Sequence, residues 1–172
     1  LLTGAPNIGK THLARELAAA LNCTGPEAPC GQCWACTHTV QGTHPDVVIV
    51  EPDGAHVKID QVRSVQHDLA LSPYQGRRRV AIISDFYLAT TEAANALLKT
   101  LEEPPAHAVL ILTATDASLL LPTIVSRCQV LALRPASVQQ IERVLVDRWQ
   151  VREDRAQLLA RLSAGRVGWA IR

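Results

Sequence analysis

The sequence predicts a three-layer α/β domain built on a parallel sheet, followed by a small helical domain. Short β-branched runs alternate with helical patterns as far as residue 133, which is typical of a parallel α/β fold. A complete phosphate-loop motif lies between the first predicted strand and the first predicted helix. Beyond residue 134 only helical patterns remain. With 172 residues, the chain is long enough for both parts.

The α/β part follows a regular order of strands and helices. The strands are indicated by short apolar, β-branched runs, and the helices by apolar residues at helical spacing. The predicted strands cover residues 1–2, 46–50, 79–83, 109–112 and 129–133. The predicted helices cover residues 11–21, 59–71 and 91–102. The last of these ends before Pro104-Pro105, because proline cannot continue a helix.

A boundary is predicted near residue 134. Pro135 ends the last strand, and Ser137 is suited to cap a helix over 138–149. Helical patterns continue over 152–162 and, after a turn at Gly165, to the last residue. We therefore divide the chain into residues 1–134 and 135–172. Because the sequence opens within a predicted strand and stops within a predicted helix, we expect a fragment of a longer protein.

The composition limits the possible classes of protein. Hydrophobic residues make up 48% and charged residues 19%, as in ordinary folded proteins. The net charge of +1 is too small for long-range attraction, so any nucleic-acid contact must come from a local patch. The arginine run at 77–79 is interpreted as the solvated start of a strand, the alternative being a subunit or DNA surface. No apolar run approaches the roughly 20 residues that span a bilayer, and no export signal is present. We expect a cytoplasmic protein without a membrane partner.

A phosphate-binding loop is predicted at residues 4–11, Gly-Ala-Pro-Asn-Ile-Gly-Lys-Thr, which fit the pattern G-x-x-x-x-G-K-[ST] in full. The loop residues Gly4, Asn7 and Gly9 present backbone N–H groups to an anion, and the following helix offers its positive end. Lys10 is expected to reach the β- and γ-phosphates of ATP, and the Thr11 hydroxyl to bind Mg²⁺. The alternatives are a chance glycine-rich turn and a loop that binds nucleotide without hydrolysing it.

A structural zinc knuckle is predicted at residues 23–36, where Cys23, Cys30, Cys33 and Cys36 lie in one short segment. Four thiolates suit tetrahedral Zn²⁺, and two-residue spacers let neighbouring sulfurs face one metal ion. Four cysteines leave no open coordination position, so a catalytic role is not expected. The alternatives are a pair of disulfides, which the reducing cytosol disfavours, and an iron–sulfur cluster.

Three segments resemble bacterial clamp-loader subunits of the delta-prime and gamma/tau type. Residues 91–105, Thr-Glu-Ala-Ala-Asn-Ala-Leu-Leu-Lys-Thr-Leu-Glu-Glu-Pro-Pro, resemble the helix that follows the Walker B strand in that family. Residues 121–128, which end in Ser-Arg-Cys, resemble its Ser-Arg-Cys segment, and the zinc knuckle resembles its insertion. The resemblance implies an AAA+ fold with a helical lid at 135–172, normally followed by a collar domain that is absent from this sequence.

The resemblance also implies partners and roles. Such subunits work in a hetero-pentamer with gamma/tau and delta subunits, which opens the sliding clamp and places it on primed DNA. Arg127 would act as an arginine finger on ATP bound by a neighbouring subunit, the alternative being an arginine that caps the preceding helix. Thr115 matches the sensor-1 threonine, the alternative being a polar strand end.

Departures from the family pattern predict a delta-prime-like stator of the DNA polymerase III clamp loader, with weak or absent ATPase activity. Ser84 and Asp85 stand where a motor subunit has Asp-Glu at the end of its Walker B strand, so Asp85 is a degenerate Walker B residue. Gly168 stands where a motor carries a lid arginine, and Arg166 would face elsewhere on a helix. Single electrostatic terms of this kind are often worth about 10²-fold in rate.

Two other functions are considered. The main alternative is a gamma/tau-like ATPase motor, because the phosphate loop is complete. A free-standing zinc-binding nucleic-acid module is a weaker alternative, since the cysteine segment lacks basic and stacking residues.

Overall fold

The chain folds around one five-stranded parallel sheet in this computed structural model, which describes residues 1–171. The strands are β1 (Leu2–Thr3), β2 (Val47–Val50), β3 (Arg79–Ile83), β4 (Ala108–Ala114) and β5 (Leu131–Ala132). The helices are α1 (Lys10–Asn22), α2 (Trp34–Gln41), α3 (Ile59–Ala70), α4 (Thr91–Glu102), α5 (Pro122–Val125), α6 (Val138–Trp149), α7 (Glu153–Leu162) and α8 (Val167–Ala170). Short 3₁₀ turns lie at Phe86–Leu88 and Ala117–Leu119.

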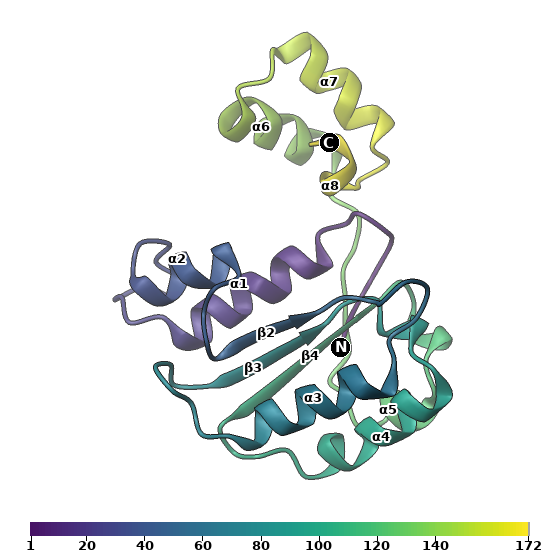
Figure 1. The fold of residues 1–172 in the computed structure, drawn as a ribbon. Coiled ribbons are helices and arrows are strands. Elements are labelled where there is room, and N and C mark those ends of the chain that lie inside the picture. The colour runs from purple at the N-terminus through teal and green to yellow at the C-terminus, as the bar shows by residue number, and fades with distance from the viewer. Residues whose placement is uncertain (172) are drawn as a thin grey trace.

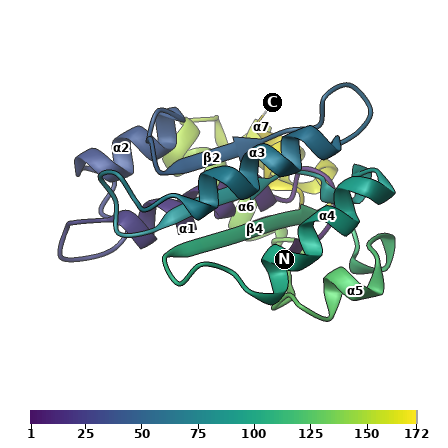
Figure 2. The same cartoon turned by 60° about the horizontal axis from the view of Figure 1, so that its bottom comes forward.

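The sheet has the strand order β2-β3-β4-β1-β5, and every pairing is parallel. Helices α1 and α2 cover one face, and α3 and α4 cover the other (Figures 1 and 2). Successive side chains of β3 point to opposite faces of the sheet, as expected for a strand buried on both sides. Val80 and Ile82 belong to the apolar cluster of α1, whereas Ala81 and Ile83 pack with Leu97 of α4. The predicted α/β fold with a parallel sheet is confirmed.

Local signals in the sequence set the ends of two helices. The Thr90 hydroxyl accepts a hydrogen bond from the backbone N–H of Ala93 at 3.2 Å, which begins α4. At α6, the Ser137 hydroxyl accepts from the N–H of Gln140 at 3.2 Å, and the Gln140 side chain accepts from the N–H of Ser137 at 2.9 Å. This reciprocal capping box confirms the predicted N-cap at Ser137.

Helices α6, α7 and α8 form a C-terminal helical unit with its own apolar cluster. Its buried members are Ile141, Leu145, Ala156, Ala160 and Ala170. Figure 1 shows this unit standing at the end of the sheet where the loop after β1 projects. No helix in the part of the chain that the structure describes is long and apolar enough to cross a membrane.

Three predicted elements need correction. The last strand is Leu131–Ala132 rather than 129–133, because this edge strand pairs only with the two-residue β1. The cysteine segment is not wholly a loop, since Cys36 lies in α2, whose polar centre hides the helical pattern. The final helix is Val167–Ala170, and Arg172, to which we expected it to extend, lies outside the described residues.

Asp46 anchors the loop that leads into β3. Its completely buried carboxylate accepts hydrogen bonds from three consecutive backbone N–H groups, those of Tyr74, Gln75 and Gly76, at 2.7, 2.8 and 2.7 Å. Burial alone raises the pKa of Asp46, but these donors and nearby Arg79 outweigh it, so the pKa lies below its usual value. The Arg79 side chain is only 12% exposed, 3.7 Å from the carboxylate, so the start of β3 is less solvated than expected.

Asn22, the last residue of α1, holds the same loop from the other side. Its side-chain oxygen accepts from the backbone N–H groups of Arg77 and Arg78 at 2.8 and 2.9 Å. Its amide nitrogen donates to the carbonyl of Arg78 at 3.1 Å. A Cβ at Gly76 would lie 2.6 Å from the Asn22 oxygen, so glycine is needed for this close approach.

Candidate nucleotide site and metal site

A cavity of 570 Å³ lies between the loop after β1 and the helical unit. Ligands of parallel α/β proteins commonly bind at this carboxyl end of the strands. The lining residues come from distant segments and are Pro6, Asn7, Gly9, Lys10, Thr11, His12, Asp85, Tyr87, Thr115, Gly168 and Ile171. The structure therefore brings together most of the predicted loop residues, Asp85 and Thr115. Gly4 lies behind them, where its N–H donates to the carbonyl of Thr115 at 3.2 Å.

The phosphate loop has the geometry of an anion-binding turn. Gly9, at the N-terminus of α1, has a φ of 108°, which glycine adopts without steric cost. The Lys10 ammonium lies within the loop and donates to the carbonyls of Gly4 and Ala5 at 2.8 and 3.1 Å. Burial lowers the pKa of Lys10, and the Asp85 carboxylate acts against this shift. The positive end of a 13-residue helix and an ammonium thus face the same space.

The residues after β3 differ in what they present to the cavity. Asp85 lines it, with φ and ψ of 48° and 46°, and its N–H donates to the Thr113 hydroxyl at 2.9 Å. Ser84 is buried and does not line the cavity. It continues the alternation of β3 on the α1 face, and its hydroxyl has no hydrogen-bond partner among the described residues.

Gly168 joins the helical unit directly to the phosphate loop. Its N–H donates to the carbonyl of Asn7 at 2.8 Å. A Cβ at position 168 would also lie 2.8 Å from that oxygen and 3.4 Å from the Asn7 carbonyl carbon. A side chain at this position would therefore require α8 or the phosphate loop to shift. Arg166 does not line the cavity, and its Nε donates to the carbonyl of Ser163 at 3.0 Å.

Arg127 lies outside this cavity, just after α5. Its Nε donates to Oε1 of Glu102 at 2.9 Å, and Nη2 lies 2.6 Å from the same oxygen. Nη1 donates to the carbonyl of Thr123 at 3.0 Å, the helix-capping contact considered as the alternative for this residue. The guanidinium is thus folded onto its own subunit. The neighbouring Cys128 packs against the main apolar cluster and is not part of the cysteine group.

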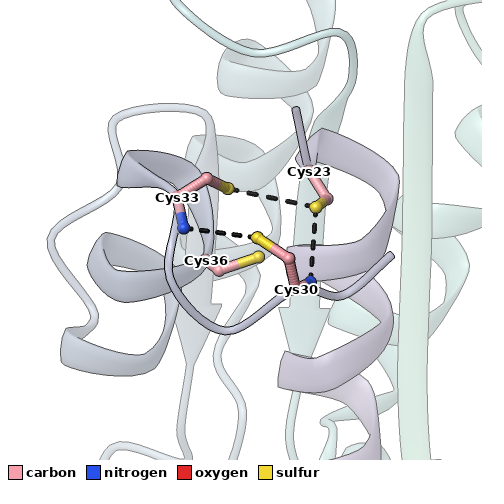
Figure 3. Close-up of side chains that lie close together, drawn as sticks. All are labelled: Cys23, Cys30, Cys33 and Cys36. Atoms are coloured by element: carbon pink, nitrogen blue, oxygen red, sulfur yellow. Dashed lines mark hydrogen bonds between the residues drawn. The ribbon is translucent and has the colours of Figure 1, made fainter. Parts of the chain in front are cut away.

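The four cysteines converge at the end of α1 and the start of α2 (Figure 3). Their sulfur atoms all lie within 4.8 Å of one another, and those of Cys23 and Cys33 are 3.9 Å apart. Zn–S bonds of about 2.3 Å in tetrahedral geometry separate the sulfurs by about 3.8 Å. A disulfide needs about 2.05 Å, and all four cysteines are free. The arrangement can hold one tetrahedral metal ion.

Backbone N–H groups point at these sulfurs, as a thiolate site requires. The N–H groups of Gly25 and Cys30 donate to Sγ of Cys23 at 3.3 and 3.4 Å, and that of Cys33 donates to Sγ of Cys30 at 3.3 Å. Backbone donors lower the pKa of Cys33 to about 5, whereas burial raises the pKa of Cys36 to about 12. A bound cation would favour the thiolate form at all four positions.

Some residues of these sites had not been identified from the sequence. His12 and Tyr87 line the cavity, and neither belongs to a motif that marks it. Glu102 was identified only as part of a family segment, yet a carboxylate in the last turn of a helix opposes the helix dipole. That unfavourable placement is a signal for a cationic partner, here Arg127.

Comparisons with known proteins give consistent results. The family model described as "DNA polymerase III, delta subunit" matches residues 1–137. Over 172 residues the chain is 38% identical to DNA polymerase III subunit tau of Salmonella typhimurium, covering 96% of this chain and 27% of that protein. Over 132 residues it is 43% identical to subunit delta' of Pseudomonas aeruginosa, covering 74% of this chain and 40% of that protein.

A solved structure of a DNA polymerase III gamma subunit-related protein from Thermotoga maritima is similar over 99% of this chain and 52% of its own chain. The TM-score is 0.69 and the sequence identity 25%. The chain thus spans between about a quarter and a half of the length of these relatives.

Proposed function

Because the chain belongs to the DNA polymerase III delta-subunit family and is a clamp-loader AAA+ subunit, we propose that it serves as a delta-prime-like stator. The relatives include both delta' and tau subunits, so sequence similarity alone does not distinguish a stator from a motor. The choice rests on the residues around the cavity. We further propose that residues 1–134 are the P-loop domain and residues 135–172 its lid.

The contact at Gly168 carries the proposal. A motor needs a lid arginine at this position, and here the backbone of the lid touches the backbone of the phosphate loop with no space for a Cβ. An arginine would require the lid to withdraw from Asn7. The lid of this chain is therefore suited to rest on the loop and unsuited to supply a cation to the γ-phosphate.

The residues after β3 support the same conclusion. Asp85 is the one carboxylate among the described residues that line the cavity. Ser84 stands where a motor has a second carboxylate, but it carries only a neutral hydroxyl and does not line the cavity. A site with one carboxylate and no lid arginine lacks two of the groups that stabilise charge during phosphoryl transfer, so turnover is expected to be weak.

The site nevertheless fits a nucleotide. The backbone N–H groups at the start of α1 and the ammonium of Lys10 offer positive charge to phosphate oxygens, and Thr11 lines the same cavity. ATP with Mg²⁺ would supply the phosphate groups that these residues hold, and Gly168 lines the same cavity. In this role the loop holds nucleotide, and the chain's own residues provide little assistance to its cleavage.

Arg127 is proposed to act on a neighbour. It does not line the cavity of its own subunit, so it cannot assist a nucleotide bound there without a large movement. As an arginine finger, it would offset negative charge on ATP held by an adjacent gamma/tau subunit. The assembly proposed is the hetero-pentamer with gamma/tau and delta subunits, which loads the sliding clamp onto primed DNA.

Zinc is proposed for the cysteine group. The sulfur spacing matches one small ion better than an iron–sulfur cluster, whose several metal atoms hold their ligands farther apart. The ion would connect α1 to α2 and has no open position for substrate. Elemental analysis of the purified protein is expected to give one zinc per chain, and a brown iron–sulfur chromophore would contradict the assignment.

ATP turnover by the full-length protein tests the stator proposal. We expect negligible ATP hydrolysis by this subunit alone. In the assembled loader, Lys10→Ala in this chain should leave ATP turnover unchanged. The competing function is a gamma/tau-like motor, which the complete phosphate loop and the 38% identity to a tau subunit favour. Vigorous hydrolysis by the isolated subunit, abolished by Lys10→Ala, would establish the motor instead.

A further inference from the structure

The guanidinium of Arg127 is almost fully occupied within its own subunit. Of its five N–H donors, the one on Nε and one on Nη2 face the carboxylate of Glu102. The two on Nη1 face the carbonyl of Thr123 at 3.0 Å and the hydroxyl of Ser126 at 3.4 Å. One donor on Nη2 is left for another acceptor. A finger in this state cannot bind a phosphate through two hydrogen bonds.

Glu102 lies at a position in its own helix that its charge does not favour. It is the last residue of α4, where the negative end of the helix dipole disfavours a carboxylate. Lys99 in the same turn has the charge that this end prefers. The described contacts of Glu102 instead point across to Arg127, 25 residues away.

We propose that Glu102 is a positioning residue that stores the arginine finger on its own subunit, so that phosphate bound by the neighbouring subunit must displace it. Carboxylate and phosphate both bind guanidinium through paired, charge-assisted hydrogen bonds, and here they compete for the same Nε–Nη2 edge. The Arg127 and Glu102 side chains are 35% and 50% exposed, so exchange needs no opening of the core. The inference rests on the proposed action of Arg127 in trans.

The test uses the full-length protein assembled with its ATPase partner subunits. Glu102→Gln keeps the shape of the side chain and removes its charge, and Glu103→Gln is the matched control, because no ion pair of Glu103 is found among the described residues. We expect Glu102→Gln to raise ATP hydrolysis by the neighbour about two- to fivefold, the value of an exposed ion pair. Glu102→Asp, which retains the charge, should stay near wild type.

Salt dependence provides a measurement that a purely structural role would not change. The gain from Glu102→Gln should shrink as ionic strength rises, because salt screens the exposed pair in the wild type. The double variant with Arg127→Ala should show no gain over Arg127→Ala alone. Unchanged or slower hydrolysis with Glu102→Gln, in a protein of wild-type melting temperature, would overturn the inference.

Different results would refute the finger role of Arg127 and its storage by Glu102. If Arg127→Ala does not slow the neighbour, the finger itself is refuted. If Arg127→Ala slows the neighbour but Glu102→Gln gives no gain, the finger stands and its storage by Glu102 is refuted.

Discussion

Replacing Gly168 tests whether the lid contact excludes an arginine. In both Gly168→Ala and Gly168→Arg, the new Cβ would lie 2.8 Å from the Asn7 carbonyl oxygen, well inside the usual contact distance. Both atoms are fixed to backbone, so no side-chain rotation relieves the overlap. Helix α8 must withdraw, and the 2.8 Å hydrogen bond from the N–H of residue 168 is lost.

The expected change in local stability at residue 168 follows from the loss of that hydrogen bond. A neutral hydrogen bond contributes about 0.5–1.5 kcal/mol net, which corresponds to about a 2- to 12-fold change in a local opening equilibrium. Alanine is about 1 kcal/mol better than glycine in a helix, so global stability should change little. We therefore expect hydrogen exchange of the amide at residue 168 to accelerate about 2- to 12-fold, with a nearly constant melting temperature.

Comparing ATP turnover in Gly168→Ala and Gly168→Arg tests whether an arginine at this position can assist hydrolysis. They share the same Cβ, so both should lose the lid contact, and neither should gain ATP turnover. An arginine that reached the γ-phosphate productively would be worth about 10²-fold in rate, as for other single electrostatic groups at such sites. Turnover that is at least tenfold higher in Gly168→Arg than in Gly168→Ala would refute the argument from the contact.

Three further predictions concern the metal site, the buried carboxylate and the phosphate loop. Gly25→Ala would place a Cβ 2.8 Å from Sγ of Cys30, so metal affinity should fall about 10- to 100-fold in a chelator titration, whereas Glu27→Ala should leave it unchanged. The lowered pKa of Asp46 contributes stability that is present above its unfolded value, near pH 4, and is lost as pH falls through the folded value. Asp46→Asn should therefore cost about 1–3 kcal/mol in urea unfolding at pH 7 and flatten the decline in acid; equal acid sensitivity of the two proteins would contradict this. Lys10→Ala should weaken nucleotide binding by about 10- to 100-fold in a fluorescence titration without changing the metal content, and unaltered affinity would argue against the loop as the phosphate site.

Local patterns were sufficient to predict most of the fold. The β-branched runs of β2 and β3 and the capping residue Ser137 act through neighbours in sequence, so their effect can be read without tertiary information. The roles of Asp85 and Thr115 came from the family resemblance, and the structure places both in the lining of one cavity. Helix α2 was missed because its polar residues and cysteine ligands give no apolar stripe.

The remaining features depend on contacts between distant segments. Gly168 and Asn7 are far apart in the chain, and no sequence pattern reveals that their backbones touch. The family resemblance alone marks Gly168 as the place of a lid arginine, and the structure adds that a Cβ there would lie 2.8 Å from the Asn7 carbonyl oxygen. The Arg127 guanidinium was likewise expected to point away from its own subunit. Its contact with Glu102 depends on how α4 and α5 pack.

Asn22 connects the cysteine group to the loop that leads into β3. Cys23, the first sulfur of the metal group, follows it directly, and the Asn22 amide grips the backbone of Arg77 and Arg78. Trypsin cleaves after arginine, but the hydrogen bonds with Asn22 hold this backbone and hinder the extended conformation that a protease requires. If the cysteine group holds the proposed metal ion, removing that ion should loosen the contact between Asn22 and the arginine pair. Tryptic cleavage at Arg77 and Arg78 would then precede any change at the nucleotide cavity.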